Sequence, residues 1–381
     1  MAISRRALLR RIGASAAVGA AVPSFAQASL VAASRDLEPQ GAAPVRLHLN
    51  ENAAGPSPLV MAAIRDLASR TLRCYPETEE AALSERLGAL HGVPASNIVL
   101  GCGSTDVMRM AAAAFAGRGT NVIVAVPTFD VLGEAASATG ADLIEVPLTS
   151  SHAHDLDAML AKVDGSTRLV YVCNPNNPTG TLTRRRDLEQ FVSALPAGVH
   201  VLIDEAYHHY AAVSSEYASF IDRPIGDSRV IVTRTFSTIH GLAGLRVGYA
   251  VAAPDVAERL AAVRLANGVS AVAAVAAVSA LADAEHVRRS VKRNADDRQE
   301  FFNQANARML RPLDSHANFV MLDTGRPGAA MVEHFRTNGV LVSGPTYGFP
   351  KSIRVSLGAA DEMRTFWRVL DLLPRLPTMS M

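Results

Sequence analysis

The stretch LVYVCNPNNPTG, residues 169–180, indicates the fold class of this 381-residue chain. Its first five residues are typical of a short, fully buried strand, and the polar loop that follows places Asn177 near the strand's carboxyl end. Ligands bind at this edge of open α/β sheets, so the loop is a candidate binding segment. The alternative is a turn stiffened by Pro175 and Pro178, and taken alone the loop favours that interpretation.

Short apolar runs with the same character recur on both sides of this stretch. They lie at 98–100, 121–125, 142–146, 199–203, 230–233 and 248–251. Several are separated by helix-like segments, and such repeated βα units predict an α/β fold with a mostly parallel sheet sandwiched by helices. Helical spacing of apolar residues also predicts helices over 58–72, 79–91 and 106–116.

The pattern changes near Pro254. It then predicts an Ala-rich helical stretch to about residue 284, a charged helix over 285–309, strands at 319–323, 340–343 and 352–356, and a last helix from Asp361. We therefore expect a large α/β domain over 58–258, followed by a linking helix and a small α+β domain over 259–381. Residues 29–57 are expected to form an arm.

The amino terminus has the three parts of a twin-arginine export signal. Arg5, Arg6, Arg10 and Arg11 precede a small apolar run, which ends at an A-x-A step, residues 26–28. A basic helix is the alternative. We expect residues 1–28 to be cleaved and the mature protein to be periplasmic or secreted.

Charge and hydropathy exclude other classes of partner. The whole chain carries a formal net charge of +1, and residues 1–28 hold four arginines and no acid, so the mature chain would carry −3. No basic field for nucleic acid remains. The mature chain has no long apolar span, so we expect no membrane-embedded body.

Other site chemistries lack their motifs. The only lysines are Lys162, Lys292 and Lys351, and none lies in a phosphate-binding G-K-[ST] loop. The chain has no H-E-x-x-H or C-x-x-C metal spacing and no G-x-S-x-G elbow, so no metal site is expected. The three cysteines do not form a disulfide framework.

Two further motifs follow predicted strands. GCGSTD, residues 101–106, leads into a helix, and its Ser104 and Thr105 are candidates to bind a phosphate; a plain tight turn is the alternative. DEAY, residues 204–207, brings the carboxylate of Asp204 to the carboxyl edge of the sheet.

In this order, the motifs from Asn50-Glu51-Asn52 to Arg354 resemble the fold-type-I pyridoxal-phosphate (PLP) aminotransferases of class I/II, over roughly residues 45–375. The histidinol-phosphate aminotransferase branch is most similar. The resemblance implies a transaminase that moves an amino group between an amino acid or amine and a 2-oxo acid. It also implies a homodimer with shared sites.

The resemblance assigns roles around the cofactor ring. Asp204 would pair with the pyridinium nitrogen, keeping the ring an electron sink. Asn177 and Tyr207 would hydrogen-bond the phenolic oxygen. Phe129 would stack on the ring, where relatives often have tyrosine. Arg354 would bind the substrate's α-carboxylate, with Asn177 nearby.

The resemblance also assigns the phosphate ligands. Ser104 and Thr105 would bind the phosphate at the helix start, together with Thr235, Ser237 and Arg246, whose guanidinium matches phosphate oxygens. Tyr75 would reach the phosphate of the neighbouring subunit.

The chain departs from the family at two positions. Ser343 replaces the arginine that helps histidinol-phosphate enzymes bind the substrate phosphate, so an unphosphorylated amino acid or amine is expected. Thr238 replaces the lysine that links covalently to the cofactor and moves the substrate proton, and threonine has neither amine nor base.

Three interpretations of Thr238 stay open. The protein is a transaminase by ancestry with low or altered turnover, or a silent protein that binds PLP or its amine adducts noncovalently, or an ordinary enzyme with a recent or artefactual change. Lys351 and His240 are the candidates to replace the lysine, and packing is the alternative role of His240.

Overall fold

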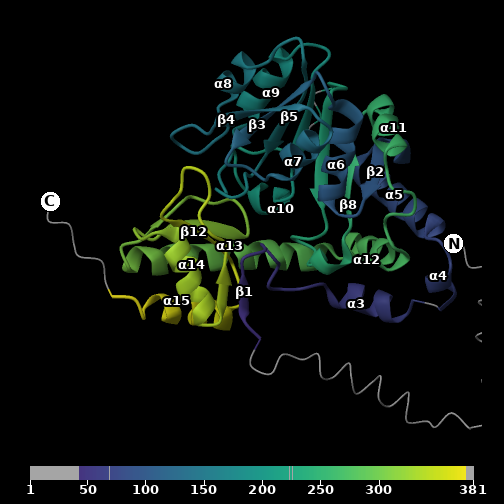
Figure 1. Ribbon diagram of the computed structural model, residues 1–381. Coiled ribbons are helices and arrows are strands. Elements are labelled where there is room, and N and C mark those ends of the chain that lie inside the picture. The colour runs from purple at the N-terminus through teal and green to yellow at the C-terminus, as the bar shows by residue number, and fades with distance from the viewer. Residues whose placement is uncertain (1–42, 68, 223, 225, 375–381) are drawn as a thin grey trace, which may run out of the picture. The chain divides into compact units, whose positions relative to one another are not determined.

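The computed structural model describes residues 43–67, 69–222, 224 and 226–374. The predicted export signal and residues 29–42 of the predicted arm therefore lie outside the described residues. Residues from Val45 onward form one compact unit. A seven-stranded sheet, built from strands between residues 98 and 251, forms the centre of its α/β part (Figure 1). Its order is β2 (Ile98–Gly101), β8 (Gly248–Val251), β7 (Val230–Thr235), β6 (His200–Asp204), β5 (Thr167–Cys173), β3 (Asn121–Val126) and β4 (Asp142–Pro147).

Only β8 runs against its neighbours in this sheet; the pairs from β7 across to β4 are parallel. Parallel pairing aligns Cys173 with Asp204 and Asp204 with Thr233. The loops after β5, β6 and β7 therefore leave the sheet at one edge, which is where the candidate site residues lie.

Alternation along the strands separates two apolar layers. In β5, Leu169, Tyr171 and Cys173 pack in one core with α6 (Ser104–Phe115), α7 (Val131–Ala138) and α11 (Pro254–Ala262), whereas Val170 and Val172 pack in another with α8 (Leu156–Ala161) and α9 (Arg185–Ala194). Successive side chains of a strand point to opposite faces, so the sheet is covered on both sides (Figure 1).

A third apolar core lies beside β2 and β8. It includes side chains from α3 (Pro58–Arg65), α5 (Glu77–His91) and α12 (Ala271–Ala282). The helix expected over 58–72 is wrong in extent, because α3 ends at Arg65 and α4 (Ser69–Arg73) is separate. Asp66 closes α3 as its C-cap, in keeping with the low helix preference of aspartate.

The chain after α12 continues as α13 (Ala284–Ala307) and a small antiparallel sheet. β10 (Phe319–Asp323) lies between β9 (Arg311–Pro312) and β12 (Ser352–Ser356), and β1 (Val45–Leu47) pairs with β11 (Val340–Val342) in parallel. Phe301, Phe335 and Phe366 pack in its core with α14 (Gly328–Thr337) and α15 (Ala360–Leu370).

The α/β fold class with a mostly parallel sheet is confirmed, and all seven large-sheet strands lie within two residues of their predicted bounds. β1, β9 and α14 were not predicted. The boundaries at 58 and 259 stay predictions. Among the residues that the structure describes, no helix is long and apolar enough to cross a membrane.

Candidate active site

Asp204 ends β6 and is 2 % exposed. Its Oδ2 accepts a hydrogen bond from the Tyr171 hydroxyl at 3.1 Å and lies 3.8 Å from the Cys173 sulfur, and its Oδ1 accepts from the Ala206 amide at 3.1 Å. Burial raises the pKa of this carboxyl to about 7, more than these hydrogen bonds lower it. A cationic ring nitrogen beside Asp204 would favour its ionised form.

Thr238 lies three residues beyond β7 and is 6 % exposed. Its hydroxyl donates to the carbonyl oxygen of Ala206 at 2.8 Å, between Asp204 and Tyr207 in sequence. Its own carbonyl accepts from the Gly241 amide at 3.0 Å. The threonine is therefore buried beside the DEAY segment with its hydroxyl satisfied, and it presents no amine.

Tyr207 follows on the same loop and packs edge-on against Phe319 of β10, with ring centroids 5.1 Å apart. Its hydroxyl accepts from Asn50 Nδ2 at 2.9 Å. Ser356 in turn fixes Asn50, because its hydroxyl accepts a hydrogen bond from the backbone N–H of Asn50 at 2.8 Å. The Tyr207 hydroxyl thus has a fixed donor and keeps its own proton for a ligand oxygen.

The start of α6 is built to hold an anion. Gly103 is the N-cap and no side chain caps the helix, so the N–H groups of the first turn, at Ser104 and Thr105, have no capping side chain as acceptor. Gly103 has a φ of +83°, which a residue with a Cβ rarely adopts, and a Cβ on Gly248 would lie 2.5 Å from the Ser104 backbone nitrogen. Gly103 therefore permits the backbone turn at the helix start, and Gly248 allows that start to approach β8.

Arg246 joins the predicted phosphate ligands. It donates to the Thr105 hydroxyl at 3.4 Å and to the Ser237 hydroxyl at 3.2 Å, while the Ser237 amide donates to Thr235 Oγ1 at 3.1 Å. The guanidinium is exposed and lies among hydroxyls, with no carboxylate in these contacts. The structure thus brings all five predicted ligands together from three segments.

Arg354 of β12 lies against a second set of acceptors. Its guanidinium donates to Asn177 Oδ1, to the carbonyl of His48 at 2.7 Å and to the Ser343 hydroxyl at 2.9 Å. Its Nε is buried without a partner among the described residues. Desolvation lowers the pKa of Arg354. None of the acceptors named above for its guanidinium is a carboxylate, so this buried cation is suited to bind the carboxylate of a substrate.

Asn176 holds the loop that carries Asn177. It accepts from the Thr128 hydroxyl at 2.7 Å and donates to the carbonyl of Pro127 at 3.1 Å. Phe129 follows Thr128 in the chain. Its side chain is half-buried and packs against the core that contains Tyr171 and Cys173. The predicted stacking residue therefore lies on the same face of the sheet as Asp204.

Tyr75 lies apart from these groups. It is 78 % exposed and, among the described residues, makes none of the contacts that join the other candidates. Its predicted role toward a neighbouring subunit stays a prediction.

The candidates for replacing the lysine are exposed or are packed against other aromatic rings. Lys162, Lys292 and Lys351 are all exposed, and Lys292 pairs with Asp296 at 2.6 Å. His240 packs against Phe236 and His209 with ring centroids 5.0 and 5.6 Å away, and burial lowers its pKa to about 4. None of these contacts joins the Asp204 site.

Residues 43–370 match the family model of the aminotransferases of class I and II. The chain belongs to this family. It is 37 % identical over 86 % of its length to a histidinol-phosphate aminotransferase of Moorella thermoacetica, covering 84 % of that protein. It is 38 % identical over 84 % of its length to an aromatic amino acid aminotransferase of Rhodococcus jostii, covering 88 % of that protein.

A solved structure agrees. The histidinol-phosphate aminotransferase of Sinorhizobium meliloti in complex with pyridoxal-5'-phosphate aligns with a TM-score of 0.81 at 28 % identity, over 94 % of this chain and 100 % of that one. The protein is thus a fold-type-I, PLP-dependent aminotransferase by family.

The described residues fit PLP in every part except its covalent anchor. The uncapped start of α6, the two glycines and Arg246 would hold the phosphate, a group of residues we call the phosphate cradle, and the buried Asp204 would pair with the ring nitrogen. When bound, this cofactor withdraws electrons from the carbon next to an amino group. Thr238 offers no atom that can bond covalently to it as lysine does.

Sequence reasoning missed Asn50, His48 and Tyr171. Asn50 stands in the motif that began the resemblance, but its contact with Tyr207 joins positions 157 residues apart. Tyr171 had a usable signal, because its alternation with Leu169 and Cys173 places it on the face of Asp204. His48 acts through its carbonyl oxygen, which no side-chain pattern reveals.

Proposed function

We propose that this protein binds PLP noncovalently and recognises unphosphorylated amino acids, with transamination far slower than that of lysine-containing relatives. The observation that carries the proposal is the Thr238 hydroxyl, buried and hydrogen-bonded to Ala206 at the base of an otherwise complete site. If transamination is absent altogether, the protein is the silent PLP-binding alternative, and the same binding residues serve it.

Loss of the lysine removes a base but leaves the binding groups. A positioned general base contributes roughly 10²–10⁴-fold to a proton transfer, so turnover is expected to fall by at least this factor. Asp204 would hold the proton on the ring nitrogen, and Tyr207 would donate to the phenolic oxygen. Neither group replaces the lysine amine.

The surroundings of Arg354 support an unphosphorylated substrate. Ser343 donates to the His48 carbonyl at 2.8 Å and accepts from Arg354, so its hydroxyl is used inside the protein. It adds no positive charge for a second phosphate. The Rhodococcus jostii relative, named for aromatic amino acids, shares 38 % identity with this chain, against 37 % for the Moorella thermoacetica relative named for histidinol phosphate, so this degree of identity is also found with a relative named for amino acids.

We also propose export through the twin-arginine route. The support is the sequence pattern of residues 1–28, and the route suits a protein that must fold around its cofactor before leaving the cytoplasm. A fusion of residues 1–28 to a reporter should reach the periplasm and lose that location when Arg5 and Arg6 become lysine. A homodimer, typical of the family, is expected.

The decisive experiment restores the lysine. Thr238→Lys should bind PLP covalently, detected as a mass increase after borohydride reduction, and should convert amino acids in a single turnover at least 10²-fold faster than the parent. Thr238→Ser, which keeps a hydroxyl and adds no amine, is the matched control and should behave like the parent.

The outcomes separate the claims. A parent chain that turns over as fast as Thr238→Lys would overturn slow transamination. A parent that fails to bind PLP would overturn the binding claim, and a strong preference for phosphorylated substrates in Thr238→Lys would overturn the substrate class.

A further inference from the structure

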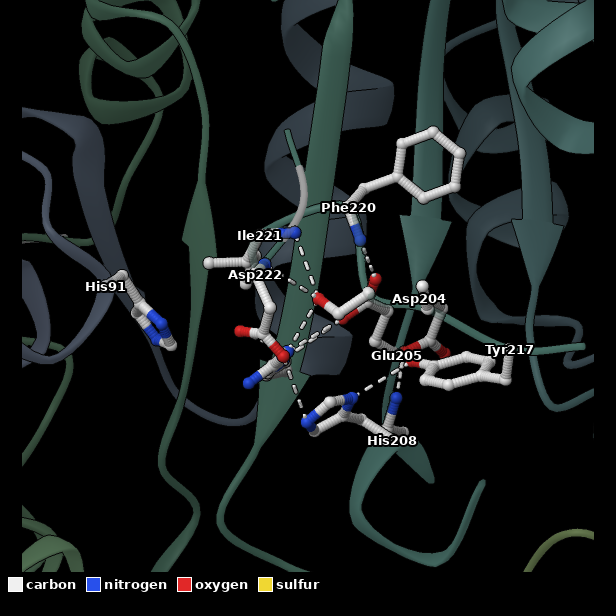
Figure 2. A network of polar contacts seen from close by, with 12 residues as sticks. His91, Asp204, Glu205, His208, Tyr217, Phe220, Ile221 and Asp222 are labelled. Carbon is white, nitrogen blue, oxygen red and sulfur yellow. Dashed lines mark hydrogen bonds and ion pairs between the residues drawn. The ribbon is translucent and has the colours of Figure 1, made fainter. Parts of the chain in front are cut away.

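A buried ion pair lies directly behind the cofactor-facing side of the sheet. Glu205 and Arg234 have side chains only 1 % and 7 % exposed, and the carboxylate Oε2 accepts from Arg234 Nε at 3.1 Å and lies 3.0 Å from Nη2. Figure 2 shows Glu205 in this network beside Asp204, with His208, Tyr217 and Asp222 around it.

Both residues are chain neighbours of cofactor-site residues but point to the other face. Tyr171 and Cys173, which contact Asp204, belong to the core with α6, whereas Phe220, whose amide donates to Glu205 Oε1 at 2.8 Å, belongs to the core with α8 and α9. Arg234 alternates in the same way with Thr235 along β7. The pair therefore connects the ends of β6 and β7 without touching the candidate cofactor ligands.

Ser219 completes the connection. Its hydroxyl donates to Glu205 Oε2 at 2.7 Å and accepts from Arg234 Nη2 at 2.7 Å and from the Ile221 amide at 2.9 Å. Asp222 lies 3.5 Å from Arg234 and the same distance from His208. The carboxylate and the guanidinium thus have several fixed partners each.

A buried ion pair is a poor source of stability, because desolvation offsets much of its attraction. It does impose geometry, since the guanidinium contacts Glu205 Oε2 through both Nε and Nη2, and two contacts from one rigid plane fix direction as well as distance. Asp204 would pair with the ring nitrogen and Thr235 would bind the phosphate, so the separation of the β6 and β7 ends would have to match one rigid cofactor.

We propose that Glu205 and Arg234 are positioning residues that set the distance between the ring-nitrogen partner Asp204 and the phosphate cradle at Thr235 and Ser237. The proposal rests on the PLP-binding part of the proposed function and is independent of turnover. It predicts that the ring site at Asp204 still binds pyridoxal and the phosphate cradle still binds phosphate when the pair is removed. The affinity for PLP, which must contact both at once, should fall.

The test compares PLP with its two halves, pyridoxal and inorganic phosphate, by equilibrium dialysis on the full chain. Glu205→Gln with Arg234→Met removes both charges together and avoids a lone buried charge. The Kd for PLP should rise roughly tenfold or more, and the Kd values for pyridoxal and phosphate should each change less than about threefold.

The control is Asp227→Asn with Arg229→Met, which removes a pair at 2.6 Å just before the amino end of β7 and should leave all three Kd values unchanged. Arg234→Lys is the second variant; it keeps the charge but loses the planar two-contact geometry, and should raise the PLP Kd roughly threefold. This variant decides the result if the double variant does not fold.

An unchanged PLP Kd in the folded variants would overturn the proposal. Equal loss for all three ligands would also overturn it, because that pattern marks general damage and not lost spacing. A parent that binds no PLP would overturn the proposed function as well, so the parent measurement distinguishes the two failures.

Discussion

At the scale of single residues, Thr238 is accommodated as a structural part of the site. The Thr238 side chain is buried, and its hydroxyl donates to the carbonyl oxygen of Ala206. The substitution therefore leaves no unpaired hydroxyl at this position. The same bond holds the loop after β7 against the DEAY loop after β6. The substitution therefore changes the chemistry of the site while keeping its two loops joined.

Thr238→Val should lower the free energy of unfolding by roughly 1–3 kcal/mol, because the Ala206 carbonyl loses its buried donor. Thr238→Ser, which keeps the hydroxyl, should lose less. Urea unfolding of the cofactor-free chain measures both, and equal stability of Thr238→Val and the parent would show that the hydrogen bond contributes nothing.

Asp204 gives a prediction about pH. Its pKa is raised from 3.8 to about 7 in the folded, cofactor-free chain, so folding is favoured by the protonated form, and that contribution is lost as the pH rises from about 4 to about 7. Relative to Asp204→Asn, the parent should lose roughly 2–4 kcal/mol of unfolding free energy across this window. Parallel pH curves for the two proteins would contradict the raised pKa.

Arg354→Lys should weaken amino-acid binding by roughly tenfold or more, because an ammonium lacks the planar fork that matches a carboxylate. PLP affinity should change less than amino-acid affinity, since Arg354 contacts one predicted ring ligand, Asn177, and no residue of the phosphate cradle. Amino-acid titration of the bound cofactor's absorbance measures the first value. Equal weakening of PLP and amino acid would place Arg354 outside the substrate site.

At the scale of elements, the approach of α6 to β8 makes the phosphate cradle. Gly248→Ala places a Cβ 2.5 Å from the Ser104 backbone nitrogen, so the helix start must move, and the Kd for PLP should rise roughly tenfold. Gly117→Ala, just beyond the other end of the helix with no atom within 4 Å of its Cβ, is the control and should bind PLP like the parent.

The elements were predictable where periodicity was strong. The buried strands β5 and β6 contain short apolar runs that are typical of strands in a parallel sheet. The predicted ends of these strands then indicated where Asp204 and Asn177 lie. β1 and β9 have three and two residues and owe their strand geometry to pairing with distant segments. Such tertiary pairing leaves no local pattern to detect.

At the scale of the whole molecule, acid stability depends on buried histidines. Burial lowers the pKa of His91, His154, His208 and His240 to about 4 each, so stability present above pH 6.5 is lost as the pH falls toward 4. Asp204 and Asp297, whose pKa values burial raises, act in the opposite direction, but they are two groups against four. The thermal midpoint of the cofactor-free chain should therefore fall between about pH 7 and pH 4; a rise would contradict the neutral state of these histidines.

The site was predictable as a set of residue types but not as a network. Motif order located the ligands, and several of them, such as Asp204 and Asn177, lie at or just beyond the end of a strand at the same sheet edge. The contacts that hold them, such as Asn50 with Tyr207 and Ser343 with Arg354, connect segments far apart in sequence. Only folding brings these partners together.

The central claim is that a complete PLP site works without a covalent anchor. Reduction of the PLP-loaded parent with borohydride, followed by intact-mass measurement and peptide mapping, tests it most directly. We predict that the protein binds PLP, that dialysis removes it, and that no lysine carries a reduced adduct. A stoichiometric adduct on Lys351 or another lysine would contradict the account.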